Sequence, residues 1–216
     1  MRTWRAALLP YPVPRQALAM GHAAEQLHPR ATYADLEAVP PHRVAELVRG
    51  TLHTFPRPAL PHAQAATELV GELAAPFGRG RGGPGGWRIL VEPELHFPDP
   101  TAPGEIEVVV PDLAGWRVER MPAVRGAAYA EVAPDWICEI LSPSTAAFDR
   151  VEKMPLYARE GVRHAWLIDP IAQTLEVFAL GAEGRWTLAG VHRDAARVRA
   201  EPFDAIELDL EVLWAK

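Results

Sequence analysis

Residues 136–141 read Trp-Ile-Cys-Glu-Ile-Leu, a nearly uniform apolar run with one carboxylate inside it. Such a run predicts a buried β-strand. Because side chains alternate along a strand, Ile137, Glu139 and Leu141 share one face. An ionised carboxylate is costly to bury unless it is paired, hydrogen-bonded or bound to a metal. Glu139 is therefore the strongest sign of a functional site, and a satisfied buried salt bridge is the alternative reading.

Further short apolar segments, separated by Pro, Gly or Asp, lie on both sides of this strand. They predict strands at 44–48, 51–55, 88–97, 106–110, 164–168, 174–180 and 185–191. Helical spacing of apolar residues predicts a helix over 62–75, and a second helix is expected around 149–160. A short capped helix is expected from Thr32 to the prolines at 40–41. Together these elements predict one α/β domain with a mixed sheet flanked by helices.

The composition is that of a globular protein. The chain has 216 residues, of which 49% are hydrophobic and 23% charged. No apolar run approaches the roughly 20 residues that span a bilayer, and the single Cys138 has no partner for a disulfide, so a reducing cytoplasm is expected. The net charge of −6 argues weakly against indiscriminate nucleic-acid binding, but clustered carboxylates that hold a metal would also make a chain acidic.

The N-terminal segment is expected to lie outside the domain. Arg2 and Arg5 followed by apolar residues faintly resemble a secretory signal, but the prolines at positions 10, 12 and 14 break the apolar stretch. We therefore expect a flexible arm over residues 1–31 and the domain over residues 32–216.

A second acid, Asp112, directly follows the predicted strand at 106–110 and Pro111. Phosphodiester hydrolysis needs an activated water, neutralised phosphate charge and a stabilised leaving oxygen, and Mg²⁺ held by carboxylates can serve all three. A lysine near the attacking water completes such a site. Taken alone, Asp112 would only make a turn, and Lys153 would be a solvated helix residue. Their combination with Glu139 favours a metal-dependent nuclease.

Five segments carry a resemblance to a known family. They are residues 111–112, 134–145, 149–153, 156–158 and 161–170, the last matching the pattern Gly-Val-x-x-x-Trp-hydrophobic-x-Asp-Pro. In these segments the chain resembles the bacterial Uma-two family of restriction endonucleases, which belongs to the PD-(D/E)XK nuclease superfamily. The resemblance runs from about Thr32 to Leu213.

The resemblance implies a restriction-endonuclease-like mixed β-sheet flanked by helices, and it implies roles for four residues. Asp112 and Glu139 become the metal ligands. Leu141 stands where the superfamily has its lysine, so Lys153 from the following helix becomes the migrated catalytic lysine. Glu46 becomes an assisting outer ligand, with a half-exposed strand carboxylate as the equal alternative. The implied cofactor is Mg²⁺, with Mn²⁺ able to substitute, and the implied substrate is DNA.

Two neighbouring features bear on this site. His62 matches a family histidine at the start of the helix, where a structural role is as well supported as proton transfer. Asp149 and Glu152 resemble a helix-capping pair, while Pro155 predicts an irregular turn around Lys153.

Two candidate functions follow, one as an enzyme and one as a binding module. The first is an Mg²⁺-dependent DNA endonuclease, in which a homodimer would bring two sites to a duplex. The second is a non-catalytic nucleic-acid-binding or interaction module that retains the nuclease fold. The three residues Asp112, Glu139 and Lys153 favour the enzyme, because a binding scaffold has no need of a costly acidic pocket.

Overall fold

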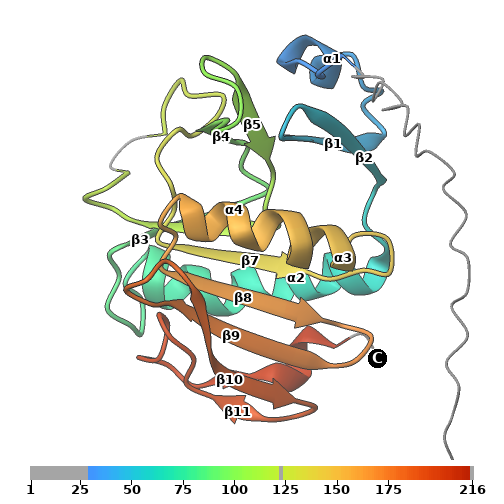
Figure 1. Cartoon of the computed structure of the whole chain (residues 1–216). Coiled ribbons are helices and arrows are strands. Elements are labelled where there is room, and N and C mark those ends of the chain that lie inside the picture. Colours follow the sequence, from blue (N-terminus) through green and yellow to red (C-terminus); the bar gives the residue numbers. More distant parts are fainter. Residues whose placement is uncertain (1–28, 122–123, 215–216) are drawn as a thin grey trace, which may run out of the picture.

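The computed structural model describes residues 29–121 and 124–214 and has an α/β architecture with two main sheets (Figure 1). The larger sheet has six strands in the order β10 (Trp186–Arg193), β9 (Thr174–Leu180), β8 (His164–Asp169), β7 (Trp136–Ile140), β6 (Leu113–Arg117) and β3 (Trp87–Val91). Only β7 and β8 are parallel, so the sheet is mixed as expected.

The second sheet is antiparallel and has four strands. Their order is β2 (Thr51–Pro56), β1 (Arg43–Val48), β5 (Ile106–Val109) and β4 (Leu95–Pro98). A small hairpin of β11 (Arg197–Val198) and β12 (Leu208–Asp209) follows near the C-terminal end of the described chain. The expectation of a single mixed sheet is thus wrong in one respect, because the strands divide between two sheets.

One segment explains the division. The apolar stretch predicted as one strand at 88–97 is two strands, β3 and β4, which belong to different sheets. Glu92 has a φ of 46°, a left-handed conformation that interrupts extended backbone, and Pro93 follows it. The sequence analysis also missed β6, which is short and contains Gly115.

The larger sheet is covered by helices on both faces. Helix α2 (Leu60–Leu73) packs Ala65, Leu69 and Leu73 into the cluster that contains Cys138 and Ile140. The other face is covered by α4 (Met154–Arg159), whose Leu156 and Tyr157 share a cluster with Ile137 and Leu141 (Figure 1). The predicted alternation along β7 is therefore confirmed, and all five of its residues are buried.

The helical segment after β7 is irregular, as Pro155 predicted. It begins as α3 (Ala146–Phe148), continues as a π-helical turn over Asp149–Lys153, and becomes regular in α4. Helix α1 (Tyr33–Glu37) has the expected capping box between Thr32 and Asp35. Two further turns complete the described helices: Ala74–Gly78 is π-helical and Leu210–Leu213 is a 3₁₀ turn.

The domain contacts begin before the predicted boundary. Arg30, which was assigned to the arm, forms ion pairs with Asp99 and Glu105, and the Ala31 N–H donates to the Gly50 carbonyl at 2.8 Å. The rest of the predicted arm, residues 1–28, lies outside the described residues. Within the described residues no helix is long and apolar enough to cross a membrane.

Candidate active site

A pocket of about 500 Å³ brings together all four residues that the sequence analysis assigned to the site. Glu46 reaches it from β1, Asp112 from the position just before β6, Glu139 from β7, and Lys153 from the π-helical turn. They come from positions up to 107 residues apart (153 − 46), so the tertiary fold alone makes the site.

Asp112 and Glu139 lie on neighbouring backbone segments. The antiparallel register of β6 and β7 pairs Leu113 with Cys138, and one further step sets Asp112 opposite Glu139. Side chains at opposite positions project from the same face of a sheet. The Ile140 N–H donates to Asp112 Oδ2 at 2.6 Å, which holds the Asp112 carboxylate against β7.

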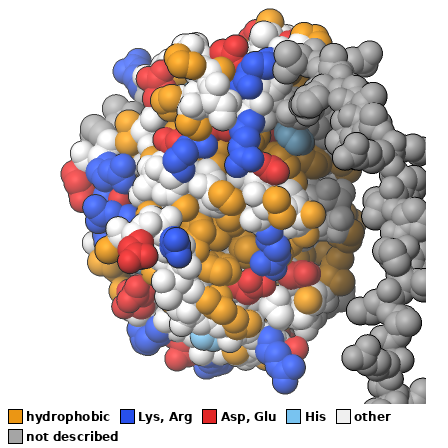
Figure 2. Space-filling view, viewed as in Figure 1, with side chains coloured by type: hydrophobic (Ala, Val, Ile, Leu, Met, Phe, Trp, Pro, Cys, Tyr) orange, Lys and Arg blue, Asp and Glu red, His pale blue; other side chains and the backbone are white. Residues whose placement is uncertain are grey.

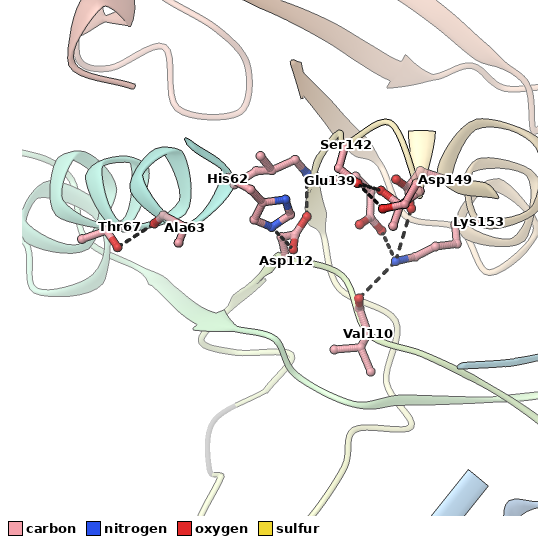
Figure 3. A network of polar contacts seen from close by, with 12 residues as sticks. His62, Ala63, Thr67, Val110, Asp112, Glu139, Ser142, Asp149 and Lys153 are labelled. Carbon is pink, nitrogen blue, oxygen red and sulfur yellow. Dashed lines mark hydrogen bonds and ion pairs between the residues drawn. The ribbon is translucent and has the colours of Figure 1, made fainter. Parts of the chain in front are cut away.

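Lys153 is the cation of the cluster (Figure 3). Its Nζ lies 2.9 Å from Glu46 Oε1, 2.9 Å from Glu139 Oε1 and 3.8 Å from Asp149 Oδ1. It also donates to the Val110 carbonyl at 3.0 Å. The π-helical turn thus directs Lys153 inward, where an exposed helix lysine would be expected from its position alone.

Burial and neighbouring charges shift the pKa values of Glu139 and Lys153. Burial raises the pKa of Glu139 well above its usual range, and the neighbouring carboxylates Asp149, Asp112 and Glu46 add to that effect against the pull of Lys153. Burial alone would lower the pKa of Lys153, but Glu139 and Glu46 outweigh it and raise that pKa. Lys153 is therefore protonated at neutral pH and acts as a cation, because it has no lone pair with which to take a proton.

Glu46 is buried, at 2% exposure, which rules out the half-exposed alternative. Its Oε1 accepts a hydrogen bond from the Val110 N–H at 2.7 Å as well as the contact from Lys153. Val110 therefore connects to Glu46 through its N–H and to Lys153 through its carbonyl. Lys153 is therefore held by Glu46 and Val110 as well as by Glu139.

Two residues of the cluster escaped the sequence analysis. Asp149 is buried inside the helical segment, so the predicted capping role with Glu152 is wrong. The Tyr157 hydroxyl donates to Glu139 Oε1 at 2.6 Å. The sequence did carry a signal for both residues. Asp149, Lys153 and Tyr157 recur at intervals of four, and residues at this spacing share one helix face.

His62 lies two residues after the start of α2 and contacts the metal-ligand candidate Asp112. The distance from His62 Nε2 to Asp112 Oδ1 is 2.8 Å. Burial lowers the pKa of His62, but its hydrogen bond to Asp112 and that carboxylate's charge raise it overall. The first turn of α2 thus brings the His62 ring against the Asp112 carboxylate.

The raised pKa of Asp149 leads to a testable prediction about the stability of the fold. Burial raises its pKa from 3.8 to about 6, so its ionised form costs stability above pH 6, and that cost is relieved as the pH falls below 6 towards 3.8. Asp149→Asn should raise the melting temperature by several degrees at pH 7.5 and by less at pH 5, from a gain of at most about 3 kcal/mol. Thermal melts at both pH values in metal-free buffer measure this, and an equal change at both would contradict it.

A comparison with known protein families identifies the family of this chain. The family model described as "Putative restriction endonuclease", Uma2, matches residues 30–211. The chain belongs to the Uma2 family. No curated protein sequence matches it.

A solved structure supports the fold of this Uma2 protein. It is a protein from Anabaena variabilis ATCC 29413, described as "a putative nuclease belonging to DUF820". The two are 24% identical, with a TM-score of 0.65, over 85% of this chain and 97% of the other. At this identity the likeness establishes the shared fold.

The carboxylate oxygens in the pocket of this Uma2 protein suit a Mg²⁺ ion that completes its shell with water and substrate. Within residues 29–121 and 124–214, no three His, Cys, Asp or Glu side chains are arranged to hold a metal on their own. Mg²⁺ usually takes one or two carboxylates and completes its shell with water and substrate phosphate. Asp112 and Glu139 fit that pattern, and their oxygens are the hard donors that it requires.

Proposed function

We propose that this Uma2 protein is a Mg²⁺-dependent nuclease that hydrolyses phosphodiester bonds of DNA. The observation that carries the proposal is the convergence of Asp112, Glu139 and Lys153 in one pocket, in a chain that belongs to this family. Asp112 and Glu139 would hold the ion. When bound, Mg²⁺ supplies charge neutralisation on the phosphate and an acidified water.

Each protein group then has a defined task. Lys153, protonated and held between Glu46 and Glu139, would stabilise the negative charge that develops on the phosphate. It would not serve as the general base, because its pKa is raised. Glu46 would position Lys153, and His62 would orient Asp112 through its 2.8 Å contact.

Cleavage of DNA with and without metal tests this proposal. We expect the purified chain to nick or cut DNA in Mg²⁺ or Mn²⁺ and to be inactive in EDTA, because without the metal no ion would acidify the attacking water or neutralise the phosphate charge. Gel analysis of plasmid and oligonucleotide substrates measures this. Calorimetry with Mn²⁺ should show binding by the wild type and none by Asp112→Asn.

The second candidate is a non-catalytic nucleic-acid-binding module. One observation favours it: in the part of the chain that the structure describes, Lys153 already neutralises acids that a metal would otherwise neutralise. DNA binding without cleavage in any divalent metal would support this module over the nuclease.

A further inference from the structure

The groups proposed for catalysis lie at the bottom of the pocket. Glu46 and Glu139 are each 2% exposed and Lys153 is 3% exposed, while the Asp112 side chain retains 17%. A phosphodiester can approach these groups only if it enters the pocket. The volume of about 500 Å³ is within the range of small-molecule pockets, roughly 300–1,000 Å³.

Besides its acidic residues, the pocket has an apolar wall. This wall is formed by α1, the β1–β2 hairpin and the segment that leads into α2. It consists of Leu36, Val39, Val44, Phe55, Pro56 and Pro58. A sugar–phosphate backbone offers little to such a wall, whereas the flat face of a nucleobase packs well on apolar side chains.

Two arginines line the same pocket without a carboxylate partner among the described residues, Arg43 and Arg57. Arg43 donates to the carbonyl and the hydroxyl of Thr54, at 2.8 and 3.0 Å. Arg57 donates to the Pro41 carbonyl at 2.6 Å. Neither guanidinium therefore forms an ion pair within the described chain, and each retains donors for a phosphate.

The surface outside the pocket does not suit a duplex on the face shown in Figure 2. There, Lys and Arg side chains are interspersed with Asp and Glu, with no continuous basic track. Continuous duplex binding depends on neutralising many phosphates at once. The described residues visible on this face offer no surface for doing so.

We propose that the pocket admits a single unpaired nucleotide, so that the substrate is single-stranded or locally unpaired DNA rather than continuous duplex. The inference rests on the nuclease function proposed above. The base packs against the apolar wall, Arg43 and Arg57 bind backbone phosphates, and the scissile phosphate reaches Asp112 and Glu139. Duplex DNA enters only where a base leaves the stack, at the cost of unpairing it.

Binding and cleavage are measured separately. Fluorescence anisotropy with Glu139→Gln in Mg²⁺ compares a labelled oligonucleotide with its own duplex. We expect the single strand to bind about tenfold more tightly. Arg57→Glu should remove most of that affinity, whereas Arg193→Glu, an exposed arginine on β10 at the far edge of the larger sheet, should leave it unchanged.

The outcomes separate this inference from the nuclease proposal. Equal binding of single strand and duplex, no binding of either, or equal losses in the two arginine variants would overturn the inference. If the wild type cuts closed duplex as fast as a single strand, the inference fails and the nuclease function stands. If the wild type cuts nothing but single-strand preference and the Arg57 effect persist, the inference stands and the nuclease function fails.

Discussion

Glu139→Gln should lower Mg²⁺-dependent DNA cleavage by more than about a hundredfold while the chain stays folded. Even outer-shell partners of metal ligands cost about 10–100-fold when they are changed, so loss of a direct ligand should cost more. Asp112→Asn should have the same effect, since both carboxylates are needed to hold one ion. Initial rates on a labelled DNA substrate, with protein in excess, measure the loss.

Stability separates a catalytic defect from a folding defect. Burial raises the pKa of Glu139, so its neutral form is favoured in the fold, and Gln resembles that form. The melting temperature of Glu139→Gln in metal-free buffer should therefore equal or exceed that of the wild type. Glu68→Gln, at an exposed position on α2, is the matched control and should keep full activity. Wild-type cleavage rates in Glu139→Gln would show that the activity lies elsewhere.

Lys153→Met should be the most destabilising single change in the pocket, by about 3–5 kcal/mol near pH 8. The substitution preserves much of the side-chain volume but removes the cation that Glu46, Glu139 and Asp149 share. The pKa values of Glu139 and Asp149, which are already raised in the fold, should then rise further above the unfolded values. The penalty is complete above those folded pKa values and is relieved as the pH falls and the carboxylates take up protons.

Denaturant unfolding at pH 8 and pH 5.5 measures this, with a smaller loss expected at pH 5.5. The same substitution in a Glu139→Gln background should cost less than in the wild type, because one fewer carboxylate remains unpaired. An equal loss at both pH values and in both backgrounds would mean that Lys153 contributes only packing.

The local patterns of the chain determined much of this structure. The alternation along residues 136–141 placed Ile137 and Leu141 on one face and marked Glu139 as a buried acid. The effect of Pro155 on the helix was also predictable, because proline acts on its immediate neighbours. These are short-range effects, and the residues that produce them are adjacent or a few positions apart.

Tertiary structure decided the rest. The contacts of Glu46 with Val110, of Val110 with Lys153 and of Asp112 with Ile140 join residues 28 to 64 positions apart, which no local periodicity encodes. The same holds for the split of residues 88–97 between two sheets, since strand pairing depends on distant partners. The sequence by itself marked Glu139 as an acid that is costly to bury. Only the fold decided that one lysine would offset that cost for three carboxylates, because a buried charge is stabilised by whatever lies beside it in space.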